Sequence, residues 1–534
     1  MNVSEVITGY LSAAGIDCVY GYPGDPNIEL LEALRAGGIE FVLARREGTA
    51  ALMAQAYGMV TGRPGVCMST LGPGASNLVN GVANAYLDRT PMLAISGQID
   101  AVREPLFTHQ VIDHNRIFSP VSKWTASVLL GNVGGIMRRA LALASAERPG
   151  PVHLTTPANV VGAEASDADI ILPPGAHADG AVALFAARGV NADVAARLRD
   201  ARRPLIIAGI SAARAKATES LVRFAENTGT PVIVSPMAKG VFPEDHALFA
   251  GTLDMACNEF LWDFVRAADL VLNVGFDAVE LIKPWQVAAP TIHIDSVANT
   301  DQIYSAAIEL VGPITAAIDA LSDDFKGAPK WTEAELATHR TDLRKLMTGG
   351  RVAGKLNPTD VVDVVRAEAA GNAVVTTDVG SHKLLVGQGW TTPNPGGVLM
   401  SNGLSSMGFS LPAGIAAKQQ LGETPVITFT GDGGLAMVQS ELRLASAMRL
   451  GLTVIVFCDG SLNRIELKQM SRQYESVGTR IEETDIEKLA GSMDCDGIYV
   501  DSEKALADAF GRQAPDRPLV IGAVIDPSQY LAQF

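Results

Sequence analysis

The stretch VITFTGDGGLAMVQSELRLASAMR, residues 426–449, decides the fold of its part of the chain. Its first five residues form an apolar run with β-branched side chains, as in a buried parallel strand. Gly431-Asp432-Gly433-Gly434 follows, and a helical pattern then runs to about Arg449. Glycine lets a backbone approach a ligand closely, and a helix N-terminus offers free N–H groups to phosphate. The stretch predicts a strand, a glycine-rich turn and a helix, although such turns are common and do not alone establish phosphate binding.

A second carboxylate is expected at the same edge of the sheet. The next predicted strand, Thr453–Cys458, leads directly into Asp459-Gly460-Ser461. Adjacent parallel strands would therefore end in Asp432 and Asp459. Two acids beside a phosphate repel each other unless a hard cation lies between them, and Mg²⁺ prefers oxygen ligands. The alternative is that both residues only cap helices, which is a common role for Asp.

The same alternation of short apolar runs and helical patterns extends along the chain. This alternation is typical of parallel sheets that helices cover on both faces. We predict an α/β fold of three successive doubly wound parallel-sheet domains. The predicted strands are Ile16–Tyr20, Phe41–Ala44, Gly65–Ser69, Met92–Ser96 and Val152–Thr155, then Pro204–Ala208, Pro231–Ser235, Leu270–Val274 and Thr291–Ile294, then Ala373–Thr377, Val426–Thr430, Thr453–Cys458, Ile498–Val500 and Leu519–Val524.

Two stretches without regular periodicity separate the three series. Residues 161–189 are dominated by Ala, Asp, Pro and Gly, and residues 321–334 break the second series with charge, Gly and Pro. Both are interpreted as linkers. We expect domains at 1–165, 185–325 and 350–534, because one hydrophobic core does not grow to the size of a 534-residue chain.

Composition and charge exclude several classes of protein. The chain is 48% hydrophobic and 19% charged with 52 glycines, which indicates a compact α/β enzyme. A net charge of -16 without clustered Lys and Arg argues against a nucleic-acid partner. The five cysteines show no paired zinc spacing. With no signal peptide and no apolar stretch long enough to span a bilayer, we expect no membrane partner and a cytoplasmic location.

The C-terminal motifs resemble those of the thiamine diphosphate dependent decarboxylases and carboligases. That family carries Gly-Asp-Gly, a spacer and Asn-Asn, and this chain has Gly431-Asp432-Gly433, residues 434–457 and Cys458-Asp459. The resemblance implies thiamine diphosphate as cofactor and Mg²⁺ held by Asp432, by Asp459 and by the backbone carbonyl of Ser461. Asp459 stands in the place of an Asn and adds a negative charge near the diphosphate.

Glu47 is the expected acid of the pyrimidine-binding domain. The segments Arg45-Arg46-Glu47-Gly48-Thr49-Ala50-Ala51 and Gly72-Pro73-Gly74-Ala75-Ser76-Asn77 resemble the signature of that domain, with Arg46 where the family has His. The resemblance implies that Glu47 hydrogen-bonds the pyrimidine ring and promotes the tautomer that activates the cofactor. The small apolar residues that follow would solvate this carboxylate poorly. A Glu in a first helical turn is also favoured by the helix dipole alone.

Two further segments extend the resemblance. Gly403–Phe409 is similar to the segment that holds the cofactor bent, which implies Met407 as the wedge between its rings and the Ser405 carbonyl as acceptor for its amino group. Asp378–His382 resembles the diphosphate-side loop of acetolactate synthases, with Gly380, Ser381 and His382 beside the phosphates. Taken alone, Met407 would be assigned to the core.

The resemblance favours carboligation after decarboxylation of a 2-oxo acid. Gly275–Glu280 looks like the middle domain of flavin-free acetolactate synthases, so FAD is doubtful. Phe107–Asp113 partly matches a loop that places Gln110 near the thiazolium. Ile465 stands where pyruvate decarboxylases carry a protonating Glu, and an apolar side chain cannot supply that proton.

Simple decarboxylation is the alternative. Gly24-Asp25 resembles pyruvate decarboxylases, in which that Asp and a nearby His handle protons, so Asp25 and His109 are a candidate pair. Glu466 follows Ile465 directly, and a shift of one residue in the comparison would reverse the protonation argument.

Two other classes are less favoured. The sequence has no Gly-x-Gly-x-x-Gly motif of the kind that NAD or FAD oxidoreductases carry, which argues against that class. A non-catalytic subunit has no reason to keep Glu47, Asp432 and Asp459 together. Because these acids lie in the first and third domains, the resemblance implies a homodimer or a dimer of dimers with active sites at the interface. The sequence does not identify the 2-oxo acid or related carbonyl substrate.

Overall fold

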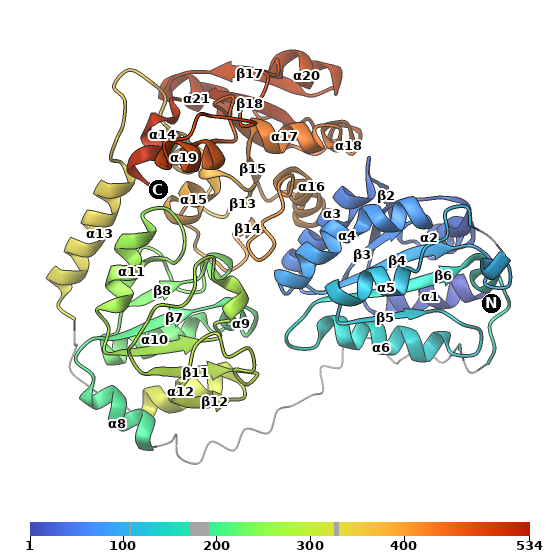
Figure 1. Ribbon diagram of the computed structural model, residues 1–534, viewed down its shortest axis with the longest axis horizontal. Coiled ribbons are helices and arrows are strands. Elements are labelled where there is room, and N and C mark those ends of the chain that lie inside the picture. Colours follow the sequence, from blue (N-terminus) through green and yellow to red (C-terminus); the bar gives the residue numbers. More distant parts are fainter. Residues whose placement is uncertain (107, 168, 171–191, 325–330) are drawn as a thin grey trace. The chain divides into compact units, whose positions relative to one another are not determined.

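The computed structural model describes residues 1–106, 108–167, 169–170, 192–324 and 331–534. Within these residues the chain forms three six-stranded sheets in which every neighbouring pair of strands is parallel (Figure 1). Buried parallel strands are covered by helices on both faces, which accounts for their nearly continuous apolar sequences. The predicted α/β class with three sheets in succession is confirmed.

The first sheet has the strand order β2-β1-β3-β4-β6-β5. Helices α3 and α4 pack on one face of this sheet, and α1 and α6 pack on the other (Figure 1). Its elements are α1 Val3–Ala13, β1 Cys18–Tyr22, η1 Asp25–Asn27, α2 Ile28–Ala36, β2 Glu40–Leu43, α3 Glu47–Thr61, β3 Gly65–Ser69, α4 Gly72–Leu87, β4 Met92–Gln98, η2 Glu104–Leu106, α5 His114–Phe118, η3 Ser119–Val121, β5 Trp124–Ser127, α6 Val133–Ser145, β6 Pro151–Pro157 and α7 Ala158–Val161.

The second sheet has the order β12-β11-β10-β7-β8-β9. Its elements are α8 Ala192–Asp200, β7 Pro204–Ala208, α9 Ile210–Arg214, α10 Thr218–Thr228, β8 Val232–Val234, η4 Pro236–Ala238, β9 Phe249–Thr252, α11 Asn258–Arg266, β10 Leu270–Val274, η5 Ala278–Glu280, β11 Thr291–Asp295, β12 Ile308–Val311, α12 Ile314–Asp324 and α13 Glu333–Met347.

The third sheet has the order β14-β13-β15-β16-β18-β17. Its elements are α14 Pro358–Glu368, β13 Val374–Thr377, α15 Ser381–Gly389, β14 Val398–Met400, α16 Ser410–Leu421, β15 Val426–Gly431, α17 Asp432–Val438, α18 Glu441–Ala447, β16 Leu452–Cys458, α19 Asn463–Ser471, α20 Ile486–Ser492, β17 Asp496–Val500, α21 Glu503–Phe510, β18 Leu519–Val524 and η6 Pro527–Ala532.

Every predicted strand is present; some have the predicted ends, and the ends of the others differ by one or two residues. The prediction of one helix from the glycine turn to Arg449 is wrong, because α17 ends at Val438 and α18 begins at Glu441. The break turns Glu441 inward, where its carboxylate accepts hydrogen bonds from the Arg45 N–H at 2.9 Å and from the Thr49 hydroxyl at 2.6 Å. These bonds satisfy the Arg45 N–H and the Thr49 hydroxyl at the start of α3. A continuous helix in place of α17 and α18 would leave both groups without this partner.

The described chain packs as two compact units. The first contains the first sheet together with residues 404–423 and 438–450, and the second contains the second and third sheets. The predicted linker at 161–189 lies largely outside the described residues, and the predicted domain boundaries stay predictions. Among the described helices, none is long and apolar enough to cross a membrane.

Candidate functional site

The third sheet has a topological switch point between β13 and β15. Strand order reverses there, so the chain leaves these neighbouring strands toward opposite faces and opens a crevice at their carboxyl ends. The loop that begins at Asp378 follows β13, and Gly431-Asp432 ends β15 and begins α17. β16 pairs with β15 on its other side and delivers Asp459 to the same edge. The topology therefore brings together the three segments in which the sequence placed the phosphate and metal residues.

Asp432 links two of these segments. Its carboxylate accepts hydrogen bonds from the Gly433 and Gly460 N–H groups, both at 2.7 Å, and from the Asp459 N–H at 3.3 Å. Burial raises the pKa of Asp432. Burial and the neighbouring Asp432 raise the pKa of Asp459 to about 7. Two acids held so close favour a cation between them, as expected for a Mg²⁺ site.

Ser461 lies in the loop between β16 and α19. Its N–H donates to Asp459 Oδ1 at 3.1 Å. The isolated bridge between Ser461 and Arg480 uses the Gly460 carbonyl and the Leu462 N–H, which leaves the Ser461 carbonyl outside that pairing. The described residues contain no group of three His, Cys, Asp or Glu side chains placed to hold a metal. The residues fit Mg²⁺ with two carboxylates and one carbonyl, because this ion keeps waters and binds phosphate oxygens as well.

His382 lies in the first turn of α15, with its ring stacked on Phe457 at 5.2 Å between centroids. Burial lowers the pKa of His382 to about 3, although a hydrogen bond with the Asp378 backbone opposes this. Its Nε2 is buried and has no hydrogen-bond partner within the described chain. A buried imidazole nitrogen without a partner suits a ligand oxygen at this edge, and an anionic oxygen would raise the pKa again.

The glycines of the site allow close packing around His382. A Cβ on Gly380 would lie 2.6 Å from His382 Cε1, and one on Gly431 would lie 3.2 Å from the same atom. A Cβ on Gly434 would lie 3.0 Å from the Asp378 carboxylate. The Ser381 hydroxyl donates to Asn463 Oδ1 at 2.8 Å and ties α15 to α19.

Glu47 is the first residue of α3 and is 8% exposed. Its Oε2 accepts a hydrogen bond from Asn77 Nδ2 at 3.1 Å. A Cβ on Gly74 would lie 3.1 Å from Glu47 Oε1, so the glycine-rich start of α4 permits this approach. Residues Thr49 to Gly58 of the helix are buried. The expected setting of small residues with little water is confirmed, whereas the action of Glu47 on a cofactor stays a prediction.

Asp25, His109 and Gln110 are exposed residues of the first unit. Asp25 follows β1 at the switch point of the first sheet, where β1 and β3 are neighbours. A Cβ on Gly72, after β3, would lie 2.4 Å from the Gln110 carbonyl oxygen. No hydrogen bond or ion pair joins Asp25 to His109 in the part of the chain that is described, and Phe107 of the same motif lies outside it. Gln110 is thus brought to this edge, and the pairing of Asp25 with His109 stays a prediction.

Ser405 and Met407 lie in the turn before α16. Ser405 has a φ of 55°, which is uncommon for a residue with a side chain. Gly408 has a φ of 80°, and Asn80 Nδ2 donates to the Ser406 hydroxyl at 2.8 Å. Met407 is partly buried. A left-handed residue at Ser405 turns its carbonyl in a direction that ordinary helix or strand geometry does not give, and the role of this carbonyl toward a cofactor stays a prediction.

The structure separates the two neighbouring positions on α19 that the sequence left open. Ile465 is 48% exposed. Glu466 is 7% exposed, and its carboxylate is bound by the Ser461 hydroxyl at 2.5 Å and by Arg480 at 2.6 Å. Glu466 therefore points toward a structural network, and Ile465 presents an apolar side chain at the surface of the helix.

Sequence analysis missed three residues that shape these segments. Asn463 joins α19 to the phosphate-side loop, Arg480 neutralises Glu466, and Glu441 holds the start of α3. The signal for Glu441 was an acid on the inner face of a helical pattern, where burial needs polar partners.

The switch point of the second sheet is filled by Glu280. The order of this sheet is that of dinucleotide-binding folds, with the reversal between β7 and β10. Glu280 is buried there and accepts from the N–H groups of Ile210 and Asp277, each at 3.1 Å, and from the Ser235 hydroxyl. Burial raises the pKa of Glu280 to about 8. A protein side chain thus takes the place at the start of α9 that a nucleotide phosphate would need.

Comparison with known proteins connects these observations. Three models of thiamine pyrophosphate enzymes match in order: the N-terminal TPP binding domain over residues 1–117, the central domain over 192–321 and the C-terminal TPP binding domain over 378–523.

The chain is also similar over most of its length to acetolactate synthases and to a probable decarboxylase. It is 27% identical to an acetolactate synthase of Bacillus subtilis, over 98% of this chain and 93% of the relative. It is 29% identical to a probable acetolactate synthase large subunit of Methanocaldococcus jannaschii, over 99% and 93%. A probable 2-ketoarginine decarboxylase of Pseudomonas aeruginosa is 28% identical over 93% and 89%. With its three matched domains, the chain belongs to the thiamine pyrophosphate enzyme family and is an acetolactate synthase-like enzyme.

Proposed function

We propose that this enzyme uses thiamine diphosphate and Mg²⁺ to decarboxylate a 2-oxo acid and to join the remaining acyl unit to a second carbonyl compound. The observation that carries the choice of carboligation is the α19 geometry. Ile465 is exposed and apolar, while the carboxylate of Glu466 is held by Ser461 and Arg480. Without an acid to donate a proton at this position, the acyl unit lives long enough to meet an acceptor.

The diphosphate end of the cofactor would be held at the carboxyl edge of the third sheet. Asp432, Asp459 and the Ser461 carbonyl are the proposed Mg²⁺ ligands, and His382 Nε2 and Ser381 would bind phosphate oxygens. The buried, unpartnered Nε2 and the paired acids support this arrangement. When bound, thiamine diphosphate supplies the electron sink that allows a bond next to a carbonyl carbon to break.

The first unit would hold the pyrimidine end. Glu47 would hydrogen-bond the pyrimidine ring nitrogen from a position with little water, where such a bond is strong. Met407 and the Ser405 carbonyl would fix the angle between the rings, and the left-handed φ of Ser405 supports that role. Gln110 would lie near the reacting carbon.

Flavin is not expected in the second sheet. Glu280 already occupies the amides at the start of α9, and a Cβ on Gly209 would lie 2.5 Å from Glu280 Oε2, so this edge is closely packed. A nucleotide phosphate there would have to displace a buried side chain.

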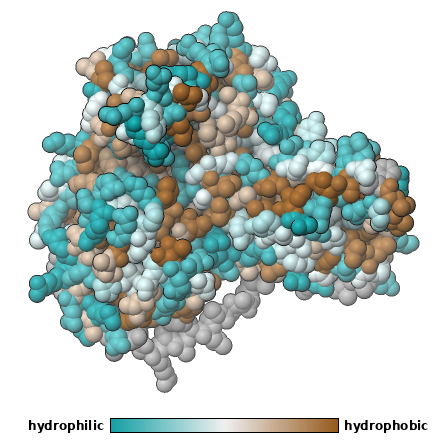
Figure 2. Space-filling model, viewed as in Figure 1, coloured by the Kyte–Doolittle hydropathy of each residue, from teal (hydrophilic) through white to brown (hydrophobic). Residues whose placement is uncertain are grey.

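Assembly through the first unit is part of the proposal. Large apolar side chains remain exposed beside its candidate loops: Tyr22 and Ile28 flank Asp25, and Leu43 precedes Glu47. Figure 2 shows hydrophobic residues reaching the surface of this unit. Exposed apolar residues around a site are typical of a surface that a partner covers. We propose a homodimer, or a dimer of such dimers, in the cytoplasm.

Simple decarboxylation is the second candidate, because Asp25 and His109, which the resemblance to pyruvate decarboxylases assigns to proton handling, are exposed, and a relative is a probable decarboxylase. The stoichiometry separates the two. Carboligation of one 2-oxo acid with itself releases one CO₂ for every two molecules consumed and yields no aldehyde, whereas decarboxylation releases one CO₂ for each molecule and yields the aldehyde.

The test is a panel of 2-oxo acids with Mg²⁺ and thiamine diphosphate, in which substrate loss, CO₂ and aldehyde are measured together. Ile465→Glu should increase the aldehyde fraction, and Ile465→Leu is its matched control. An aldehyde yield equal to substrate loss in the wild type would overturn the carboligase proposal.

A further inference from the structure

A cavity of about 320 Å³ lies in the second unit beside the candidate cofactor loops, but none of the residues proposed to hold the cofactor lines it. Its walls come from the segment 254–260, from α15 and α19, and from residues 532–534. Most of the lining is apolar, including Met255, Leu346 and Leu384. A volume at the small end of the ligand-site range, which is about 300–1,000 Å³, suits a small molecule with an apolar part.

The walls are held by hydrogen bonds that do not involve a ligand. The Cys257 N–H donates to the Gln533 carbonyl at 3.2 Å, and the Ala256 N–H donates to the Leu384 carbonyl at 3.1 Å. The Asp254 carboxylate accepts from the Ile282 N–H at 2.7 Å and from Trp262 Nε1 at 2.9 Å. The cavity is therefore pre-formed, which lowers the entropy cost of binding.

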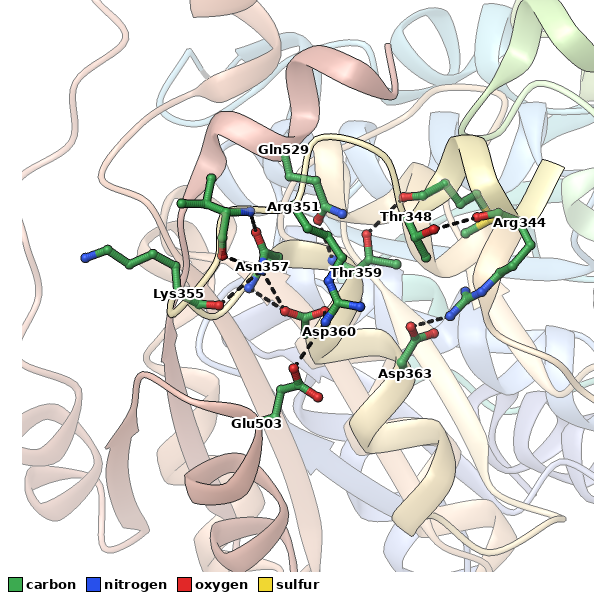
Figure 3. Close-up of polar contacts among 12 residues, drawn as sticks. Arg344, Thr348, Arg351, Lys355, Asn357, Thr359, Asp360, Asp363, Glu503 and Gln529 are labelled. Atoms are coloured by element: carbon green, nitrogen blue, oxygen red, sulfur yellow. Dashed lines mark hydrogen bonds and ion pairs between the residues drawn. The ribbon is translucent and has the colours of Figure 1, made fainter. Parts of the chain in front are cut away.

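The wall at residues 532–534 is anchored from α14 (Figure 3). Figure 3 shows Gln529 against Thr359, whose N–H donates to Gln529 Oε1 at 3.0 Å. The side chain of Gln533 reaches the same helix, where its Nε2 donates to Thr359 Oγ1 at 2.9 Å. Asp360 in that turn is paired with Arg351, which also contacts Glu503. These bonds fix the position of Gln533 at the cavity.

Three polar groups of the lining lack an ionic or hydrogen-bond partner in the described chain. Arg464 is partly buried, lies 4.7 Å from the centre of the Phe534 ring, and has no carboxylate partner among the described residues. Burial lowers the pKa of Arg464. Gln533 is 3% exposed, and its Oε1 is a buried acceptor without a donor in the described chain, as is Oδ1 of Asn258.

The other charges of the lining are already paired. Lys283 forms an ion pair with Glu259 at 2.9 Å, and Glu259 also contacts Arg266. Both carboxylate oxygens of Asp254 accept hydrogen bonds. Among the described residues of the lining, Arg464 therefore remains as a cation without a carboxylate partner, and the same lining contains two acceptors that need donors and an apolar wall.

We propose that this cavity binds a small carboxylic acid that carries a hydrogen-bond donor and an apolar side chain. The carboxylate pairs with the Arg464 guanidinium, the donor faces Gln533 Oε1 or Asn258 Oδ1, and the side chain lies against Met255 and Leu384. A hydroxyl or an ammonium group next to the carboxylate meets this description, so 2-hydroxy acids and apolar amino acids are the two sources of such a ligand.

Calorimetric titration of the full chain without thiamine diphosphate tests the site independently of the proposed reaction. The probes are 2-hydroxyisovalerate, L-valine and isovalerate, which lacks the donor. We expect saturable binding of one of the first two, at least tenfold weaker binding of isovalerate, and at least a tenfold loss in Arg464→Gln with an unchanged melting temperature. Whichever of the first two binds more tightly identifies the donor as hydroxyl or ammonium.

Lys283→Gln is the matched control, because this cation also lines the cavity but is already paired, and its affinity should stay within about twofold. Arg464→Lys keeps the charge and should recover part of the affinity lost in Arg464→Gln. The proposal fails if no probe binds saturably, if Arg464→Gln binds as the wild type does, or if both glutamine variants lose affinity equally.

Discussion

Glu280→Gln should change how the stability of the protein depends on pH. Burial raises the pKa of Glu280 to about 8 from an ordinary value near 4.5. In the folded protein this carboxyl therefore stays protonated at a pH where the unfolded chain has already ionised. Its contribution to stability is fully present below about pH 4.5, falls as pH rises and is lost above about pH 8.

The magnitude follows from the two pKa values. At about 1.36 kcal/mol per pH unit, ionisation of Glu280 costs up to about 5 kcal/mol across the whole range. Between pH 5.5 and 8 the corresponding loss is up to about 3 kcal/mol, and structural relaxation with water entry reduces it further. For a domain of this size that loss lowers the melting temperature by up to about 10 °C. Glutamine does not titrate and keeps an acceptor oxygen for the Ile210 and Asp277 N–H groups.

The assay is the thermal midpoint of the wild type and of Glu280→Gln, measured in matched buffers from pH 5.5 to 8. We expect the melting temperature of the wild type to fall more steeply with rising pH than that of Glu280→Gln. The melting temperature of the variant relative to the wild type should therefore increase as pH rises. Glu259→Gln is the control, because Glu259 is exposed and ion-paired and should leave the slope almost unchanged. Parallel profiles for the wild type and Glu280→Gln would refute the assignment of a protonated carboxyl at this position.

Three further predictions concern the cofactor site. Asp432→Ala should weaken Mg²⁺-dependent retention of thiamine diphosphate at least a hundredfold, as measured by equilibrium dialysis. In the same assay the cofactor affinity of Asp459→Asn should stay within a few-fold of the wild type. A severe loss in Asp459→Asn would show that the site needs the extra charge. Glu47→Gln should keep cofactor affinity but lose at least 99% of turnover, and a wild-type rate of C2 hydrogen–deuterium exchange in this variant would contradict the role of Glu47. Mixed Glu47→Ala and Asp432→Ala chains should regain activity once tagged heterodimers are verified, and inactive verified heterodimers would refute a shared interface site.

The strands that sequence analysis missed share one place in the sheets. Gly65–Ser69, Pro204–Ala208, Leu270–Val274 and Leu519–Val524 were predicted with their observed ends; all four are interior strands, and all but the last are fully buried. The missed strands are β5, β9, β12 and β14, and each lies at the edge of its sheet. An edge strand contacts one neighbour and is partly open to water, so it does not need the continuous apolar run that marks a buried parallel strand.

The pairing of Asp432 with Asp459 could be predicted because it depends only on local order. Each acid follows a strand, and neighbouring parallel strands end at one edge. That Glu280 fills the crevice at the switch point of the second sheet could not be predicted in the same way. Gly275–Glu280 carries an acid after a strand just as Gly431-Asp432 does, but Glu280 turns back onto the Ile210 N–H group, a contact between residues 70 positions apart.

The positions Ile465 and Glu466 show why the reaction itself depends on the fold. Neighbouring residues on a helix point about 100° apart, so an acid one position away is not a substitute for an acid at the site. The contacts of Glu466 decide which of the two side chains is exposed on the helix. Its partners are Ser461, before the helix, and Arg480, in an irregular segment after it, which pairs back onto the Ser461 loop. That segment carries no periodic pattern from which its path could be inferred. Arg480 supplies the counter-charge that the buried carboxylate of Glu466 needs. The ion pair therefore keeps this side chain in its buried position. Under the proposed function, the same contact would withhold Glu466 as a proton donor and leave the apolar Ile465 at this helix.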